Sequence, residues 1–227
     1  MKTIAVRHVD RADPAHVAEL GRAGAATVHE AIGRSGLLQP YLRPIYPGAA
    51  AAGPAITVLA QPGDNWMLHV AVELCQPGDL LVVACTTQNT DGMFGDLLAT
   101  SLAARGVVGL VIDSGCRDVA TLRKMQFPVW SRAVSARGTV KATLGAVNVP
   151  VVCAGALIHP GDVVIADEDG VVVVPRADTG SAVTATRQRI EREELNRKRL
   201  ATGELGLDIY DMRETLARAG LVYVDHE

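Results

Sequence analysis

The stretch that decides the fold is Gly95-Asp96-Leu97-Leu98, followed by Arg105-Gly-Val-Val-Gly-Leu-Val-Ile-Asp113-Ser-Gly-Cys-Arg117-Asp118. Residues 97–105 are good helix formers, and Asp96 stands where the N-cap of that helix is expected. The apolar run 107–112 is typical of a short buried strand, and a second helical pattern begins directly after Asp118. The stretch therefore predicts alternating helices and strands with polar groups at two junctions.

These junctions bring together groups that bind anions and cations. The first amides of a helix lack intrahelical partners and favour an anion, so a small carboxylate or phosphate is expected at Leu97 and Leu98. Arg117 would pair with a substrate carboxylate or keto oxygen and stabilise an enolate, and Asp118 would bind a divalent metal. The alternatives are ordinary helix caps for Asp96 and Asp118, and a salt bridge from Arg117 to Asp113 or Asp96. The pattern favours a site for an oxo acid.

Composition narrows the functional class. The chain has 227 residues and a formal net charge of -3, which predicts one domain or a tightly joined pair and no nucleic-acid partner. The basic cluster 197–199 is better explained as a solvated helix face. The first residues show no signal-peptide pattern, and no apolar run approaches the length of a membrane span. We therefore expect a cytoplasmic enzyme without a membrane partner.

Several familiar catalytic arrangements are missing from the sequence. The four cysteines show no Cys-x-x-Cys spacing and are expected to be reduced, and Cys75, Cys85 and Cys153 are expected to be buried. Cys116 differs because it adjoins Arg117, but it is a poor candidate for a nucleophile. The histidines lack zinc-site spacing, and His69 is expected to be a packed or surface histidine, with a position in the lining of a pocket as the alternative. No nucleotide-binding glycine motif is present, and neither Lys124 nor Lys141, the latter expected in a strand, has the surroundings of a Schiff base. Metal-assisted enolate chemistry is preferred.

The rest of the chain predicts layered strands and helices. Helices are expected over residues 14–23, 27–32 and 66–74, and strands over residues 55–60, 162–166 and 171–174, the last two forming a hairpin. Two Pro-Gly-Asp turns contain Asp79 and Asp162, whose side chains are expected to bond nearby amides rather than do chemistry.

A long polar helix is predicted near the C-terminus, over residues 177–201. Its apolar edge consists of Ile190, Leu195 and Leu200 alone, and so thin a stripe favours packing across a subunit boundary. We accordingly divide the chain into an α/β catalytic core, residues 1–176, and a helical arm and tail, residues 177–227; the family resemblance described below implies that this arm completes a neighbouring site.

The quoted motif resembles that of the class II pyruvate aldolases that cleave 4-hydroxy-4-methyl-2-oxoglutarate and 4-carboxy-4-hydroxy-2-oxoadipate. These share a superfamily with the regulator of ribonuclease E activity A, a protein-binding inhibitor. The resemblance extends from Thr27-Val-His-Glu-Ala-Ile-Gly33 to the tail 205–213. It implies an α/β fold, a layered β/β/α swivelling-type domain, and a trimer or hexamer with active sites between subunits.

The resemblance also implies roles for individual residues. Asp118 matches the aspartate that binds Mg²⁺, which Mn²⁺ or another divalent cation can replace, and Asp96 matches a residue that holds a metal-bound water. Glu193 matches a glutamate that reaches the neighbouring subunit's site, although Glu191 or Glu194 could occupy that position instead. The expected substrate-binding set is Gly95, Asp96, Leu97, Leu98 and Arg117, and the expected catalytic set is Arg117, Asp96 and Glu193.

The expected activity is retro-aldol cleavage of one of these 4-hydroxy-2-oxo acids to pyruvate and a second 2-oxo acid, in the catabolism of aromatic compounds. Decarboxylation of oxaloacetate is expected as a side reaction because it forms the same enolate. The alternatives are a non-catalytic regulator that resembles the ribonuclease E inhibitor and a dedicated oxaloacetate decarboxylase.

Overall fold

The computed structural model describes residues 3–226 of the chain. The chain separates after Thr186 into two compact units, residues 1–186 and residues 187–227, and each is described by itself. The expected functional division after residue 176 stays a prediction.

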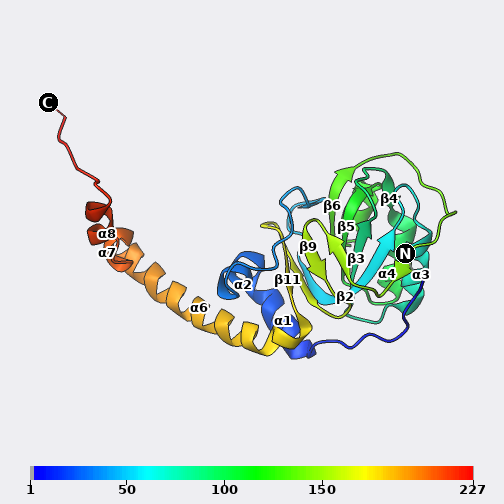
Figure 1. Ribbon diagram of the computed structural model, residues 1–227, viewed down its shortest axis with the longest axis horizontal. Coiled ribbons are helices and arrows are strands. Elements are labelled where there is room, and N and C mark those ends of the chain that lie inside the picture. The colour runs from blue at the N-terminus through cyan, green and yellow to red at the C-terminus, as the bar shows by residue number, and fades with distance from the viewer. Residues whose placement is uncertain (1–2, 227) are drawn as a thin grey trace. The chain divides into compact units, whose positions relative to one another are not determined.

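A nine-stranded mixed sheet forms the centre of the first unit (Figure 1). Its strands follow the order β1-β6-β5-β3-β2-β10-β11, with β4 added beside β5 and β7 beside β2. The strands of this sheet are β1 (Arg43–Pro44), β2 (Ala51–Ala60), β3 (Leu80–Cys85), β4 (Gly92–Phe94), β5 (Gly109–Cys116), β6 (Val129–Val134), β7 (Ala146–Val147), β10 (Val163–Ala166) and β11 (Val171–Val174). A separate hairpin consists of β8 (Val151–Cys153) and β9 (Ala156–Ile158).

The sheet curls into a half-barrel because β2 takes part in two kinds of pairing. Residues 51–54 of β2 pair antiparallel with β10, whereas residues 55–60 pair parallel with β3. The central strands β2, β3, β5 and β6 are mutually parallel and rich in Val, Leu and Ile, as strands covered on both faces require. Their carboxyl ends therefore lie at one common edge.

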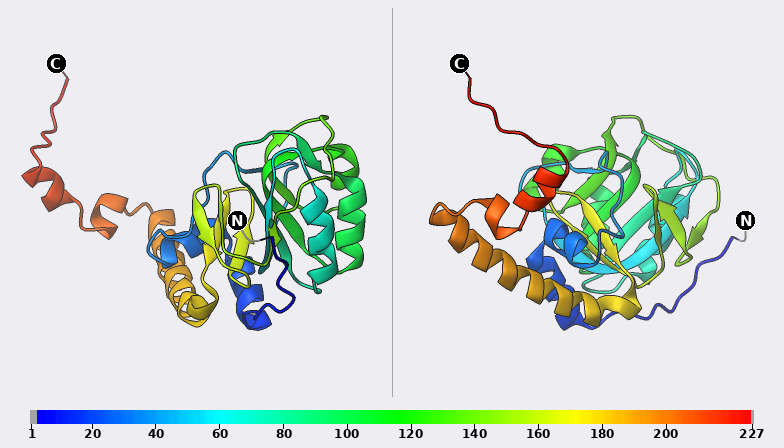
Figure 2. Two further views of the ribbon diagram at one scale, coloured as in Figure 1. Left: turned by 45° about the vertical axis from the view of Figure 1, so that its right-hand side comes forward. Right: turned by 60° about the vertical axis from the view of Figure 1, so that its left-hand side comes forward.

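Three hydrophobic clusters join the layers. Helices α3 (Trp66–Leu74), α4 (Asp96–Ala104) and α5 (Val119–Lys124) pack on one face of the parallel strands, and the β8–β9 hairpin packs on the other (Figure 2). Helices α1 (Pro14–Ala23) and α2 (Ala25–Ala31) cover β10 and β11, whose side chains alternate between two of the clusters. This arrangement confirms the predicted layered α/β fold.

The two Pro-Gly-Asp turns are structural, as predicted. Asp79 is fully buried and receives Nε and Nη2 of Arg11 at 2.7 and 2.8 Å, together with the amide of Gln76. Asp162 accepts hydrogen bonds from the amides of His159 and Arg176, and the β10–β11 hairpin that follows it is confirmed. Both carboxylates thus stabilise turns at the starts of strands.

The predicted long helix is α6 (Thr179–Ala201), preceded by a short 3-10 turn at Arg176–Asp178. Ala182 and Val183 on its first turns are buried with α1 and α2. In the second unit, Ile190, Leu195 and Leu200 are exposed, and the short helices α7 (Gly206–Ile209) and α8 (Arg213–Arg218) follow. Packing of α6 on a neighbouring subunit stays a prediction.

None of the helices within residues 3–226 is both long enough and apolar enough to cross a membrane.

Candidate functional site

The candidate site lies where β5 and β4 end, at the carboxyl edge of the parallel strands. The amide of Arg117 donates to the carbonyl oxygen of Phe94 at 2.8 Å, which ties the end of β5 to the loop that starts α4. The two junctions that were separated by about 20 residues in the quoted stretch therefore form one structure.

Helix α4 begins one residue earlier than predicted. Gly95 is its N-cap, and Asp96 is its first helical residue, so the predicted N-cap role of Asp96 is wrong. The capping acceptor comes instead from Asp118, whose Oδ2 accepts the amide of Asp96 at 3.2 Å. A Cβ on Gly95 would lie 2.3 Å from that oxygen, so only glycine allows the carboxylate to approach.

The amides of Leu97 and Leu98 remain available for a ligand. Within residues 3–226, no hydrogen-bond acceptor lies against either amide, whereas the amide of Ala99 already donates to the carbonyl oxygen of Gly95 at 3.1 Å. The first turn of α4 thus presents two free N–H groups, as the sequence predicted for an anion site.

Arg117 pairs with its neighbour in the chain. Its Nε lies 3.4 Å from Oδ2 of Asp118, and its side chain is 46% exposed, so the guanidinium can still reach a ligand. The alternative salt bridge to Asp113 is wrong, because Asp113 receives Nε of Arg132 at 2.8 Å from the adjacent strand β6. Asp118 adopts a left-handed backbone conformation with φ of 58°, which turns its carboxylate back over the start of α4 rather than α5.

A cavity of about 90 Å³ opens beside the first turn of α4. It is lined by Asn65, His69, Gly92, Met93, Gly95, Asp96, Leu97, Leu98, Arg117 and Lys141. The lining includes the whole predicted substrate-binding set, and it also includes His69, for which the sequence favoured a packed or surface position over the pocket. On the far side of Arg117, Asp118 lines a second hollow of about 360 Å³ with Val119 and Val134.

Lys141 is the residue that sequence reasoning misplaced. It lies in a loop, not in a strand, and it lines the cavity together with Asn65. Both residues are brought there by contacts between α3 and a loop more than 70 residues away, and nothing in the local pattern signals such a contact.

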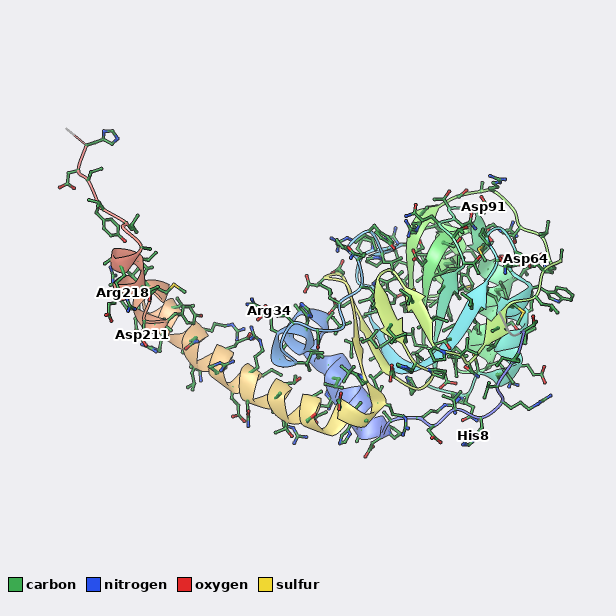
Figure 3. All side chains as sticks on the ribbon, viewed as in Figure 1. His8, Arg34, Asp64, Asp91, Asp211 and Arg218 are labelled. Carbon is green, nitrogen blue, oxygen red and sulfur yellow. The ribbon has the colours of Figure 1, made fainter. Side chains whose placement is uncertain are left out.

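Buried Asp64, which is labelled in Figure 3, makes that contact. It accepts the amide of Trp66 at the start of α3 at 2.9 Å, and the amides of Ala142 and Thr143 at 2.8 and 2.6 Å. Burial alone would raise the pKa of Asp64, but these backbone donors outweigh it and lower the pKa below 3.8. The charged carboxylate therefore holds the loop against α3.

The histidine in the cavity is held in its neutral form. Burial, and to a lesser degree the nearby Lys141 ammonium, lowers the pKa of His69 below 6.5. At neutral pH, His69 therefore offers one N–H donor and no charge, and the cations facing the cavity are Arg117 and Lys141.

Asp118 can hold a divalent cation. Its second oxygen, Oδ1, accepts no hydrogen bond from residues 3–226, whereas Oδ2 lies against the backbone of Gly95 and Asp96. In this described part of the chain, no three His, Cys, Asp or Glu side chains gather into a metal cage. One carboxylate with surrounding water suits a hard cation such as Mg²⁺ and does not suit structural zinc.

Glu193 belongs to α6 in the second unit. Its Oε1 lies 2.7 Å from Nη2 of Arg189, four residues earlier, and Glu194 pairs with Arg197, three residues later. Both glutamates thus carry helix ion pairs, and the assignment of one of them to a neighbouring site stays a prediction.

Cys75 and Cys153 are buried, as the sequence predicted, Cys85 is only partly buried, and Cys116 is buried as well. Burial raises the pKa of Cys75 and of Cys85 to about 12, and it also raises the pKa values of Cys116 and Cys153. Thiols with raised pKa values are poor nucleophiles at neutral pH, which argues against Cys116 as a nucleophile.

The fold and the site define a mixed α/β protein with a small cavity lined by free helix amides and by Arg117 and Lys141, beside the carboxylate of Asp118. The chain belongs to the RraA-like family, whose model, described as Aldolase/RraA, matches residues 25–173.

Two relatives are provisionally named 4-hydroxy-4-methyl-2-oxoglutarate aldolase. The one from Halalkalibacterium halodurans is 27% identical over 169 residues, which cover 74% of this chain and 80% of that protein. The one from Burkholderia multivorans is 35% identical over 143 residues, which cover 63% of this chain and 87% of that protein. These names point to a lyase.

Among solved structures, Streptomyces coelicolor RraAS2 is similar with a TM-score of 0.73 and 30% identity, covering 83% of this chain and 98% of that one. It is described as an unusual member of the RNase ES inhibitor RraA protein family. The family thus includes proteins named as enzymes and proteins named as inhibitors.

Proposed function

We propose that this protein is a divalent-metal-dependent lyase that cleaves 4-carboxy-4-hydroxy-2-oxoadipate or 4-hydroxy-4-methyl-2-oxoglutarate by a retro-aldol reaction. The observation that carries the proposal is the grouping of Arg117, Asp118 and the free amides of Leu97 and Leu98 around one helix start. A regulator that binds only a protein surface has no need for such an arrangement.

The substrate would be anchored through its pyruvyl half. The amides of Leu97 and Leu98 bind the C1 carboxylate, and the Arg117 guanidinium donates to the neighbouring keto oxygen. As the bond between C3 and C4 breaks, its electron pair forms the enolate of pyruvate, and Arg117 stabilises the charge that develops on the oxygen. Protonation at C3 then gives pyruvate, and C4 leaves as the carbonyl of the second 2-oxo acid.

Asp118 would hold the divalent cation, which supplies Lewis-acid polarisation of the keto group when bound. Asp96 lines the cavity, where its carboxylate orients the water that removes the proton from the C4 hydroxyl. In a trimer or hexamer, Glu193 of a neighbouring subunit would complete this hydrogen-bonded set.

The decisive experiment measures pyruvate release from 4-carboxy-4-hydroxy-2-oxoadipate, coupled to NADH oxidation, after treatment with EDTA and again after addition of Mg²⁺. We expect activity only with the metal, and we expect Asp118→Ala to lower kcat/KM at least about 1000-fold because it removes the only protein ligand proposed. Asp10→Ala is the matched control, since that carboxylate is 66% exposed and remote in sequence from the site.

The contrary outcome is activity that survives EDTA or persists in Asp118→Ala, which would remove the metal and Asp118 from the proposal. If the wild-type protein is completely inactive with both substrates, the second candidate function, that of a protein-binding regulator, is favoured. The similarity to RraAS2 supports this second candidate.

Oxaloacetate provides a further comparison. Loss of carbon dioxide from it forms the same pyruvate enolate, so decarboxylation faster than that caused by Mg²⁺ alone is the expected side activity. A kcat/KM for oxaloacetate above that for either aldol substrate would identify a dedicated decarboxylase instead.

A further inference from the structure

The side chain of Arg117 lies across the backbone of two glycines. A Cβ atom on Gly92, in β4, would lie 3.3 Å from Cβ of Arg117, and one on Gly95 would lie 3.2 Å from both Cγ and Nε. Because these distances are shorter than ordinary contacts between carbon atoms, the arginine side chain rests directly on bare backbone. For Gly95 the nearest atom is Oδ2 of Asp118, whereas for Gly92 it is a backbone oxygen.

That oxygen belongs to the segment of residues 135–138, which follows β6. A Cβ on Gly92 would lie 2.3 Å from the carbonyl oxygen of Ser135 and 3.1 Å from that of Arg137. The amide of Gly92 donates to the carbonyl oxygen of Arg137 at 2.8 Å. Gly92 does not have a positive φ, so alanine could adopt its backbone conformation, and glycine is required there only for this close approach.

The same segment reaches the guanidinium of Arg117. A Cβ on Gly138 would lie 3.6 Å from Nη1, and the amide of Ser135 donates at 2.9 Å to the carbonyl oxygen of Cys116, the residue before Arg117. The segment is therefore bonded both to β4 and to the end of β5, and its backbone lies against the tip of the arginine.

These contacts restrict a side chain that its ion pair restrains only weakly. The Arg117 side chain is 46% exposed, and its Nε lies 3.4 Å from Oδ2 of Asp118. An exposed ion pair of this kind contributes little, and a long side chain held by it alone samples several rotamers. Contact with Gly92 and with the 135–138 segment removes that freedom.

We propose that Gly92 is a positioning residue for Arg117. Its lack of a side chain lets the 135–138 segment close against β4, and the two together hold the guanidinium beside the first turn of α4. This inference rests on the proposed function, in which Arg117 stabilises the enolate. Gly92 itself takes no part in bond breaking.

Gly92→Ala is the test variant. Its methyl group must displace the carbonyl oxygen of Ser135, and with it the 135–138 segment, so that Arg117 gains freedom. We expect kcat for 4-hydroxy-4-methyl-2-oxoglutarate to fall about 10- to 100-fold, as a displacement of about 1 Å predicts, whereas KM should change less than about threefold. In the Arg117→Ala background, Gly92→Ala should lower kcat less than about twofold further, because the residue through which it acts is gone.

Gly53→Ala is the matched control for a clash with backbone. A Cβ there would lie 2.4 Å from the carbonyl oxygen of Gly78, near the start of β2 and away from the carboxyl edge of the strands. Its melting temperature should fall as that of Gly92→Ala does, because both clashes strain the fold, but its kcat should stay at the wild-type value.

Gly138→Val reaches Arg117 without a clash in the fold. Within residues 3–226, Nη1 of Arg117 is the only atom within 4 Å of a Cβ placed on Gly138, its chain neighbours apart. The branched side chain should push the guanidinium away and lower kcat as Gly92→Ala does, with the melting temperature unchanged. This variant keeps the proposal testable if Gly92→Ala does not fold.

Modification of Arg117 by phenylglyoxal, followed by mass spectrometry, reports the freedom of the guanidinium without any activity. Its rate should rise severalfold in Gly92→Ala and stay at the wild-type value in Gly53→Ala.

An unchanged kcat in Gly92→Ala or in Gly138→Val would overturn the role of Gly92. An equal loss from Gly92→Ala in the wild-type and Arg117→Ala backgrounds would overturn it as well, while cleavage by the wild-type protein leaves the proposed function intact. If the wild-type protein cleaves neither substrate, the proposed function fails, and the rate of modification by phenylglyoxal decides by itself whether Gly92 holds Arg117.

Discussion

Gly95 and Asp118 show how the site depends on single residues. The carboxylate of Asp118 reaches the amide of Asp96 because Gly95 has no side chain, and the left-handed backbone at Asp118 directs it there. This contact also keeps Asp118 beside Arg117, so that the anion-binding and cation-binding groups stay within one helix start.

Gly95→Ala should therefore damage the site and spare the fold. The φ of Gly95 is −150°, which alanine adopts freely, but the new Cβ would lie 2.3 Å from Oδ2 of Asp118 and displace the carboxylate. We expect kcat/KM to fall about 100-fold, as a displacement of about 1 Å predicts, with little change in the melting temperature. Both quantities are measured by the coupled assay and by circular dichroism.

Gly138→Ala is the control, because its Cβ would lie at an ordinary 3.6 Å from Nη1 of Arg117. If Gly95→Ala and Gly138→Ala lower kcat/KM equally, the contact with Asp118 is not the cause of the loss.

At the scale of elements, the cavity is assembled by connections between segments rather than within them. Asp64 links the start of α3 to the 139–145 loop, and the amide of Arg117 links β5 to the loop before α4. Each connection uses a backbone donor and a fixed acceptor, which gives the lining residues a stable arrangement before a ligand arrives.

Asp64→Asn tests the first of these connections through its pH dependence. At pH 7 we expect the free energy of unfolding to fall by about 2 kcal/mol, since the NH2 group that replaces Oδ2 cannot accept from the amides of Ala142 and Thr143. The folded-state pKa of Asp64 lies below 3.8, so this stabilisation is fully present above about pH 4 and is lost as the pH falls through that lowered pKa.

Urea unfolding of the wild type and the variant between pH 7 and pH 3 measures the difference. If the wild type and Asp64→Asn differ as much in free energy of unfolding at pH 3 as at pH 7, the charge of Asp64 is not the source of the stabilisation. Asp10→Asn, at an exposed carboxylate, should change the free energy of unfolding by less than about 0.5 kcal/mol at any pH.

At the scale of the whole molecule, α6 extends into a unit whose apolar side chains are exposed within the single chain. Leu195 and Leu205 are 63% and 55% exposed, and Tyr210 is 51% exposed. Burial of such side chains against a second copy of the chain would stabilise an oligomer, and it is through an oligomer that Glu193 would reach a site.

Mixed oligomers test whether sites are shared between subunits. Arg117→Ala and Glu193→Gln should each be nearly inactive, and refolding them together should recover about a quarter of the wild-type activity, the share expected from random pairing in a closed ring. If both residues act within one subunit, the mixture stays inactive. Glu191→Gln and Glu194→Gln, tested in place of Glu193→Gln, identify which glutamate is involved.

The sequence by itself determined the local elements of this protein. The helix at Trp66–Leu74, the β10–β11 hairpin and the long α6 follow from caps, turns and apolar periodicity, which act over a few neighbouring residues. The placement of Arg117 and Asp118 at a strand–helix junction was predictable for the same reason.

Only the tertiary structure decided which groups meet. Asp118 caps α4 in place of Asp96, Arg132 takes the Asp113 carboxylate that was open to Arg117, and Lys141 joins His69 at the cavity. Each of these contacts joins segments at least 19 residues apart, and each depends on strand order and on the space around a glycine or a buried carboxylate. Local sequence patterns carry no information on these contacts, because the packing of the layers decides which distant segments meet.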